Sequence, residues 1–170
     1  RKLFIDLDDN VIKNVFKLYP WEFIVNEPFA KNIITDINKT FWIEPSWKMI
    51  LSNKAILPIL WQLFPNHDYL LESYFEGDTS KSCDGLTMLG DYVKKPLLSR
   101  EGANVEIYKK GVLVDSTSGI YNNSPRIIQE FCELPRFGDY NALVGSWIIG
   151  QEPAGIGIRE GGIITNNISR

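Results

Sequence analysis

YVKKPLLSREGANV, residues 92–105, is the most informative stretch of this chain of 170 residues. Its two lysines, Lys94 and Lys95, stand at the end of a short β-like run and directly before Pro96. A turn containing Gly102 follows, and a second β-like run begins at Val105. Compact ammonium groups and the backbone N–H groups of such a turn both suit anions, so the stretch is a candidate phosphate site. A surface hairpin with solvated lysines explains the same pattern without a ligand.

The composition is that of a globular protein with the length of one ordinary domain. Hydrophobic residues make up 44% of the chain, charged residues 23%, and the net charge is −3. No apolar run reaches the roughly 18 residues that a membrane span needs, so we expect no membrane partner. The mildly acidic balance argues against nucleic acid as a partner.

The cysteine and histidine pattern argues against a zinc site. Cys83 and Cys132 lie far apart and form no paired motif, which fits a reducing compartment, and we expect a cytoplasmic location. His67 has no His or Cys neighbour at metal-ligand spacing. The acidic residues near the start, Asp6, Asp8 and Asp9, are interpreted as a polar turn. We therefore assign no metal-binding residue.

The first half of the chain is predicted to be mainly helical. Strand-like runs at residues 11–18 and 41–45 alternate with patterns of helical spacing, at residues 20–25, 46–51 and 54–64. Ser46 and the pair Ser52–Asn53 are interpreted as helix caps. Pro58 lies inside the last helical pattern and implies either a kink or a helix that begins close before it.

The second half is predicted to be rich in antiparallel strands. A polar loop, residues 75–91, precedes them. Residues 105–108 and 112–115 alternate around Lys109-Lys110-Gly111, and residues 142–149 and 154–158 flank a turn at Gly150–Pro153. Helices followed by an antiparallel sheet define the α+β class. No linker is long enough to separate two independent domains.

Several further segments recur in the same order in one protein family. They are residues 16–22 (FKLYPWE), 44–48 (EPSWK), 52–58 (SNKAILP), 92–96 (YVKKP), 99–105 (SREGANV), 145–147 (GSW) and 153–160 (PAGIGIRE). On these segments the chain resembles the C-terminal part of the synthetase domain of glutathionylspermidine synthase-like ATP-grasp proteins. The resemblance covers nearly the whole chain, and residues 99–105 and 154–160 are its most specific parts.

The resemblance implies a partial ATP-grasp fold, in which two α+β lobes grip ATP. Residues 1–170 would be a portion of a synthetase domain truncated at both ends, because both termini interrupt β-like or ordered sequence. The implied activity is an ATP-dependent carboxylate–amine ligase that forms an amide through an acyl phosphate. The implied partners are ATP, Mg²⁺, a peptide or small-molecule carboxylate, and an amine such as a polyamine or amino acid.

The resemblance also implies which residues contact the phosphates. Lys54 and Lys95 match the two phosphate-contacting lysines, and Lys95 is favoured over Lys94 because the family lysine immediately precedes the proline. Neighbours on a strand point to opposite faces, so only one of the two can face the nucleotide. Glu101 and Gly102 match the loop that covers the phosphates, with backbone amides as the contacting groups. A solvated lysine in a first helical turn is the alternative for Lys54.

Three further parts of the implied site lie toward the C-terminus. The adenine would be lined by Gln129, Glu130, Phe131 and Cys132, and another ATP-lining stretch would be Ile163, Ile164 and Thr165. Phe131 and Cys132 could equally be ordinary core residues. Arg159 matches the arginine that stabilises the transition state in the family. A guanidinium suits that role because it bonds two oxygens at once. A surface charge at a strand end is its alternative.

Two departures limit the implied function. The magnesium ligands of the family lie in an acidic Glu-x-Asn segment upstream of this chain, and the sequence has no equivalent. Leu18 stands where the bifunctional enzyme has a substrate-contacting threonine, so glutathione and spermidine are not assigned as substrates. We therefore expect the isolated chain to be inactive. The alternative function is a non-catalytic nucleotide-binding module of the same fold.

Overall fold

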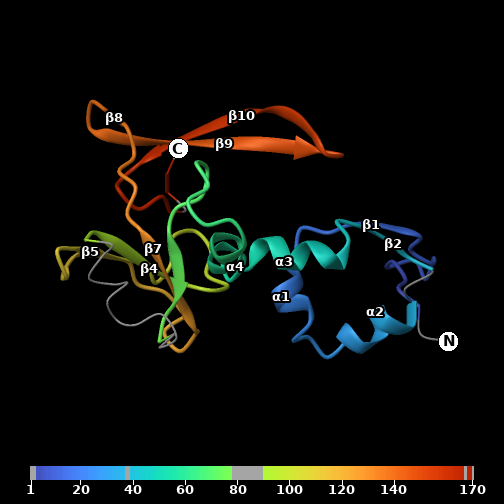
Figure 1. The fold of residues 1–170 in the computed structure, drawn as a ribbon. Helices are drawn as coiled ribbons and strands as arrows, with labels where there is room; N and C mark the ends of the chain where they lie inside the picture. Colours follow the sequence, from blue (N-terminus) through green and yellow to red (C-terminus); the bar gives the residue numbers. More distant parts are fainter. Residues whose placement is uncertain (1–2, 37–38, 78–89, 167, 170) are drawn as a thin grey trace. The chain divides into compact units, whose positions relative to one another are not determined.

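The computed structural model describes residues 3–36, 39–77, 90–166 and 168–169 (Figure 1). The chain divides into two compact units, Arg1–Asn53 and Lys54–Arg170, and each is described by itself. Among the described residues, no helix is both long and apolar enough to cross a membrane.

The first unit contains a pair of parallel strands. β1 (Asn14–Phe16) lies beside β2 (Phe41–Ile43), with Asn14 opposite Phe41. Because parallel neighbours need a crossover connection, the chain between them is long enough to form α1 (Trp21–Ile24) and α2 (Ala30–Asp36). A 3₁₀ helix, η1 (Ser46–Lys48), and α3 (Met49–Ser52) follow.

Aromatic side chains hold the first unit together. Trp21 and Ile24 on α1 are buried. The Trp42 ring lies 5.3 Å from the Trp21 ring and 5.4 Å, edge-on, from the Phe4 ring. The Trp21 Nε1–H donates to the Glu44 carbonyl at 3.2 Å. Tilted and edge-to-face rings of this kind add to the stabilisation from area burial, so this cluster is the centre of the unit.

The acidic residues near the start form the predicted turn. The backbone N–H groups of Asp8 and Asn10 both donate to Asp6 Oδ1 at 2.9 Å, and Asp9 has a φ of 63°. The hydrogen bond from the Asn10 N–H lowers the pKa of Asp6. The cluster is therefore used to close a loop.

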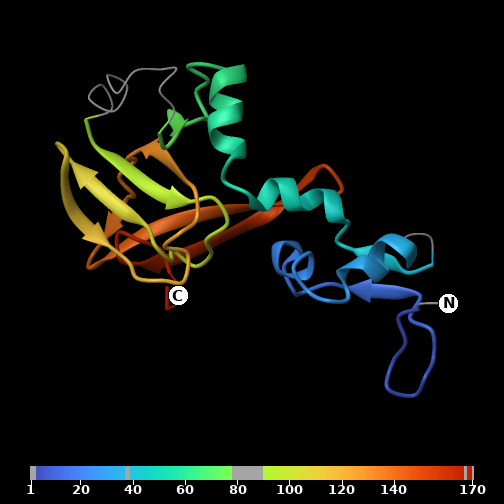
Figure 2. The same cartoon turned by 90° about the horizontal axis from the view of Figure 1, so that it is seen from below.

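The second unit begins with α4 (Ile56–Leu63) and contains a five-stranded sheet in which every neighbouring pair is antiparallel (Figures 1 and 2). In spatial order its strands are β3 (Ser73–Phe75), β7 (Arg126–Glu130), β4 (Tyr92–Pro96), β5 (Glu106–Lys109) and β6 (Val112–Ser116). β4 is the central strand: residues 92–94 pair with both β5 and β7, whereas Lys95 and Pro96 pair with β7 alone.

A three-stranded antiparallel sheet completes the second unit. Its strands are β8 (Arg136–Phe137), β9 (Tyr140–Ile149) and β10 (Glu152–Gly161). The hairpin between β9 and β10 turns at Gly150 and Gln151, whose φ values are 58° and 79°. Two successive residues with positive φ match the type I′ turn that favours tight hairpins.

A cluster of buried residues of the second unit lies on one face of the five-stranded sheet. Val93, Val105 and Ile107 form a buried cluster, against which Phe131, Ile163 and Ile164 pack. Val93 and Lys95 are two residues apart on β4, so they share this face. The core therefore supports the same side of the sheet that carries Lys95.

The expected order of elements is confirmed: helices dominate the first half and antiparallel strands the second. The parallel pairing of β1 and β2 was not expected, and α2, β3 and β8 were missed, because short elements carry little periodicity. α4 begins two residues before Pro58, so this proline lies in the first turn of a helix that starts close before it.

The expected caps are wrong. Ser46 lies inside η1, where Pro45 precedes the helix, and α4 follows Ala55; neither helix start has a side-chain cap hydrogen bond. Ser52 and Asn53 instead end α3. Most of the polar loop at residues 75–91 lies outside the described residues; β3 extends into its first position, Phe75.

Candidate functional site

The two neighbouring lysines of β4 point to opposite faces of the sheet. The Lys94 ammonium donates to Glu76 Oε1 at 2.8 Å and lies 5.4 Å from the Tyr108 ring centroid. The Lys95 ammonium donates to Gln129 Oε1 at 2.8 Å on the other face. This is the alternation that the strand period predicts. Lys94 is neutralised by a carboxylate, whereas Lys95 bonds an uncharged amide.

Lys54 meets the same region from the start of the second unit. Its backbone N–H donates to the Leu97 carbonyl at 2.8 Å, and its ammonium donates to the Ser99 carbonyl at 2.5 Å and to Ser99 Oγ at 3.3 Å. These contacts attach Lys54 to the segment that leaves β4. A residue distant in sequence is thereby brought beside the lysine stretch.

Lys54 and Lys95 are close enough to influence each other. Burial, and secondarily the charge of Lys54, lower the pKa of Lys95 from 10.5 to about 8. Among the described residues, no carboxylate forms an ion pair with Lys95. Two ammonium groups held near each other in this way form a local positive potential that favours an anion.

The loop after β4 has the backbone shape of a tight turn. Ala103 N–H donates to the Arg100 carbonyl at 2.9 Å, and Glu101 and Gly102 have φ values of 53° and 70°. A Cβ on Gly102 would lie 2.5 Å from the Thr165 carbonyl oxygen and 3.0 Å from Ile164 Cγ2. Position 102 therefore needs glycine for both conformation and space. The Glu101 side chain is exposed, so the backbone of this residue, and not its side chain, shapes the turn.

Residues 163–165 connect this loop to Arg159. Ile163 and Ile164 pack on the core, while Thr165 lies against Gly102. The Arg159 guanidinium, exposed on β10, donates to the Asn166 carbonyl at 2.7 Å. The described structure records no direct contact between Arg159 and either lysine. Arg159 lies on β10, a few residues before the segment that packs on the glycine loop.

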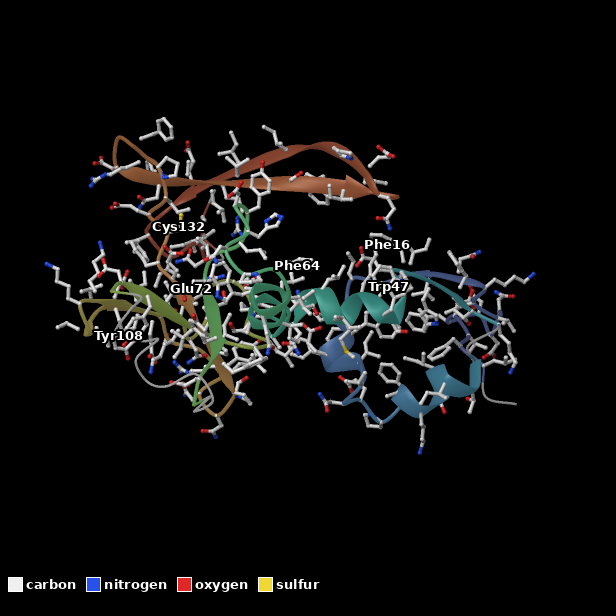
Figure 3. The ribbon with its side chains drawn as sticks, viewed as in Figure 1. Phe16, Trp47, Phe64, Glu72, Tyr108 and Cys132 are labelled. Atoms are coloured by element: carbon white, nitrogen blue, oxygen red, sulfur yellow. The ribbon has the colours of Figure 1, made fainter. Side chains whose placement is uncertain are left out.

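The four residues at 129–132 have unlike environments. Gln129 is buried, and Glu130 is exposed with its backbone N–H bonded to the Glu72 carbonyl at 2.8 Å. Phe131 packs on the core, with the Lys109 ammonium 4.9 Å from its ring centroid. Cys132 is exposed where the chain leaves β7, and Figure 3 labels it there. The core alternative therefore fits Phe131 and is wrong for Cys132.

Three contributions to the site were not predicted. The Ser99 carbonyl and hydroxyl hold Lys54, the side chain of Gln129 holds Lys95, and Ser73 holds Gln129. Ser99 lies inside the most specific motif, so its involvement could have been expected. Ser73 and Gln129 needed the pairing of β3 with β7 and of β7 with β4, which no local pattern shows.

The donor set suits an anion and does not suit a magnesium ion. In the described ranges no group of three or more His, Cys, Asp or Glu side chains could hold a metal ion. Mg²⁺ prefers oxygen ligands, and carboxylates above all, whereas the side-chain contacts of Lys54 and Lys95 that the described residues show are to Ser99 and Gln129. We assign no step to a metal at these residues.

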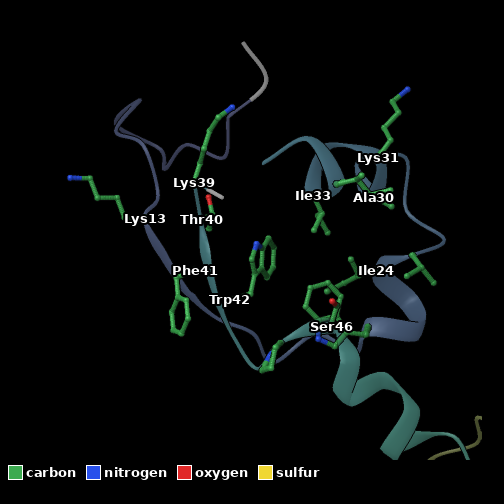
Figure 4. A pocket seen from close by; sticks show the side chains of 14 residues that line it. Lys13, Ile24, Ala30, Lys31, Ile33, Lys39, Thr40, Phe41, Trp42 and Ser46 are labelled. Atoms are coloured by element: carbon green, nitrogen blue, oxygen red, sulfur yellow. The ribbon is translucent and has the colours of Figure 1, made fainter. Parts of the chain in front are cut away.

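The first unit contains a cavity of about 810 Å³, shown in Figure 4. Its lining is largely apolar, and the indole N–H of one lining residue, Trp42, is buried without a hydrogen-bond partner in the described part of the chain. Lys54, Lys95 and the other predicted site residues are absent from its wall. The cavity is therefore a feature of the first unit and is not the phosphate site that the sequence predicts.

The ammonium groups of Lys54 and Lys95 and the turn at Gly102 form a candidate site for an anion. Comparison with known proteins gives the family: the model described as "Glutathionylspermidine synthase preATP-grasp" matches residues 1–170. The chain belongs to this family.

Named relatives are consistent with this membership. A Haemophilus influenzae protein, assigned by name to the acid–amine ligases, is 43% identical over 94% of this chain and 40% of its own length. Trypanothione synthetase of Crithidia fasciculata is 30% identical over 92% of the chain and 26% of its own length. The bifunctional glutathionylspermidine synthetase/amidase of Escherichia coli is 36% identical over 68% of the chain and 18% of its own length. The chain thus spans less than half the length of these relatives, which are ligases and synthetases by name.

Proposed function

We propose that this chain is the nucleotide-gripping part of an ATP-dependent carboxylate–amine ligase with an ATP-grasp fold. The observation that carries the proposal is the placement of Lys54 and Lys95 near each other, with the Lys95 ammonium bonded to a neutral amide and, among the described residues, to no carboxylate. The names of the relatives support the amide-forming chemistry. Residues 1–170 would be a portion of a larger synthetase domain.

The proposed reaction has two steps. A carboxylate oxygen attacks the γ-phosphorus of ATP, and the bond from that phosphorus to the bridging oxygen breaks. The products of this step are ADP and an acyl phosphate. An amine nitrogen then attacks the acyl carbon, loses a proton and expels inorganic phosphate. Negative charge spreads over the phosphoryl oxygens in the first step, so cations held in place before reaction lower its barrier.

Each residue has a proposed role in this chemistry. Lys54 and Lys95 contact phosphate oxygens, the backbone of Glu101 and Gly102 covers the phosphates, and Arg159 stabilises the transferring group. Adenine is lined by the backbone at residues 129–132 and by residues 163–165. The packing of Ile164 and Thr165 against Gly102 supports placing the loop and this segment in one site.

The substrates are proposed by class. Relatives named for glutathionylspermidine and trypanothione synthesis support a peptide or small-molecule carboxylate and an amine such as a polyamine or amino acid. Leu18 leaves the particular pair open. A cytoplasmic reaction with Mg²⁺ bound to ATP completes the proposal, and no magnesium ligand is assigned among the described residues.

A non-catalytic nucleotide-binding module is the second candidate. The Arg159 guanidinium donates to the Asn166 carbonyl at 2.7 Å, and this contact occupies a donor that the ligase would use on the transferring phosphoryl group, which favours the module. The two candidates differ in turnover, since both bind ATP and only the ligase releases ADP in a way that depends on acid and amine.

ADP release by the full-length protein tests the proposal. A panel of peptides should be crossed with polyamines and amino acids, and we expect at least one pair to raise ADP release well above the rate with either substrate alone. ATP binding without any such pair would favour the non-catalytic module, and absence of ATP binding would overturn both candidates. We further predict that the isolated 170-residue chain releases no ADP with the active pair.

A further inference from the structure

A chain of hydrogen bonds runs away from the Lys95 ammonium into the sheet. Lys95 donates to Gln129 Oε1 at 2.8 Å, and Gln129 Nε2 donates to Ser73 Oγ at 3.0 Å. The Ser73 hydroxyl donates to the Leu71 carbonyl at 2.9 Å. Gln129 is 6% exposed and Ser73 only 1%. The path from the ammonium to the backbone is thus closed to water at its inner end.

The direction of this chain is determined by its two ends. A lysine ammonium only donates and a carbonyl only accepts, so the Ser73 hydroxyl gives its proton to Leu71 and keeps a lone pair for Gln129. The amide NH₂ of Gln129 must face Ser73, and its oxygen must face Lys95. The pairing of Ser73 with Gln129 across β3 and β7 holds this arrangement in register. Reversal of the amide would set two donors against each other at Lys95.

The neutral amide has a consequence that a carboxylate would not have. A glutamate at position 129 could hold the lysine in the same place, but it would cancel the positive charge and repel a phosphate. Glutamine orients the ammonium and leaves its charge available, and the three hydrogen bonds limit the positions that the long side chain can take. Orientation before binding removes part of the entropy that binding would otherwise cost.

We propose that Gln129 is a positioning residue that aims Lys95 at the phosphate site, and that Ser73 fixes the orientation of Gln129. This inference rests on the proposed function, because it assumes that Lys95 binds a nucleotide phosphate. It gives the Gln129 side chain a role apart from the lining of adenine.

The surroundings of Lys95 make the proposal measurable by pH. Among the described residues, Lys54 is the charged group that acts on it, from the segment before α4, while Gln129 faces it from β7 with Ser73 of β3 behind Gln129. Lys94 and Glu76 pair on the opposite face, and Asp115, opposite Ile107, is exposed on the edge strand β6. Because the Lys95 pKa is about 8, its affinity for an anion should fall as pH rises through that value.

The test is the dissociation constant of adenylyl-imidodiphosphate for the full-length protein, measured by calorimetry between pH 6.5 and 9.5. In the unmodified protein we expect the constant to rise above about pH 8, approaching tenfold per pH unit for one proton. We call the pH at which the dissociation constant begins to rise the break. Lys95→Met should remove this break. Gln129→Glu should weaken binding at pH 7 about tenfold and move the break to higher pH, since a carboxylate partner favours the charged lysine.

Variants that delete the acceptor should move the break the other way. Gln129→Met keeps the length of the side chain and should shift the break to lower pH, and Ser73→Ala should do the same to a smaller extent. Ser73→Ala also tests the positioning role if Gln129→Met does not fold. A uniform loss of affinity with an unmoved break in these variants would overturn the positioning role. If Lys95→Met changes neither affinity nor break, the proposed function fails instead.

Discussion

Lys95 carries a cation into a partly buried position where its closest contact is neutral and another lysine lies nearby. Its neighbour Lys94 shows the usual arrangement, an ammonium paired with a carboxylate, Glu76. Burial of an uncompensated charge costs free energy, so residues placed in this way are candidates for function. The contrast between the two lysines also provides a matched pair of variants.

Lys95→Met should weaken ATP binding by the full-length protein roughly ten- to a hundredfold, the range expected for one hydrogen bond to a charged group. Lys94→Met, which alters the opposite face, should change ATP affinity less than about threefold. Equilibrium titration with ATP checks both. Equal losses in the two variants would contradict the assignment of one face to the nucleotide.

The low pKa of Lys95 also predicts how stability depends on pH. Between the folded pKa of about 8 and the unfolded value of 10.5, the unfolded chain holds a proton that the folded chain has lost. Stability should therefore rise with pH in this range, by at most about 1.4 kcal/mol per pH unit. The melting temperature of the unmodified protein, relative to that of Lys95→Met, should increase from pH 7.5 to 9.5. A difference that is constant or falls would show that Lys95 is not held in this way.

Arg159→Ala separates catalysis from binding. If Arg159 stabilises the transferring group, its loss should reduce kcat about a hundredfold or more while ATP affinity changes less than about threefold. Arg136→Ala, which removes another exposed arginine of the same three-stranded sheet, is the control and should leave both unchanged. Equal losses of kcat and affinity would restrict Arg159 to binding, and no loss would support its interpretation as a surface charge.

At the scale of elements, the loop between β4 and β5 depends on one glycine. Gly102 and Gly111 share a positive φ, 70° and 77°, but only Gly102 would place a Cβ against another backbone; at Gly111 nothing lies within 4 Å. Their alanine variants therefore share the conformational cost and differ in the clash.

Gly111→Ala should cost about 1 kcal/mol of stability, the cost of a left-handed residue with a Cβ. Gly102→Ala should cost more and should also weaken ATP binding, because Thr165 or the loop must move. Thermal melts and ATP titration of the two variants provide the comparison. Similar behaviour of both alanine variants would mean that the contact between Gly102 and Thr165 does not shape the site.

The β4 strand and the hairpins could be predicted because their signals are local. The proline after the lysines marks the end of β4. The hairpin turns are marked by glycines, in Lys110-Gly111 and Gly150-Gln151. The parallel pair β1–β2 and the path from Lys95 to Ser73 could not, because they join residues distant in sequence. Gln129 was expected to line adenine as part of residues 129–132, and the contact of its side chain with Lys95 follows only from the register of β4 with β7.

At the scale of the whole molecule, every residue predicted to contact ATP belongs to the second unit, Lys54–Arg170. The family match covers both units, and the relatives are named as ligases and synthetases. The unit boundary falls between Asn53 and Lys54, inside residues 52–58, one of the segments on which the family resemblance rests. The motif therefore ends one unit and begins the next with Lys54, the first of the two lysines proposed to contact phosphate.

Chemical labelling of the full-length protein locates the nucleotide most directly. An acyl-phosphate derivative of ATP transfers its acyl group to a lysine amine beside the bound phosphates, and mass spectrometry identifies the acylated residue. We predict labelling of Lys95 and Lys54 that excess ATP suppresses, with Lys94 labelled no more than other exposed lysines. Labelling of Lys94, or of other lysines in place of Lys54 and Lys95, would contradict the proposed phosphate site.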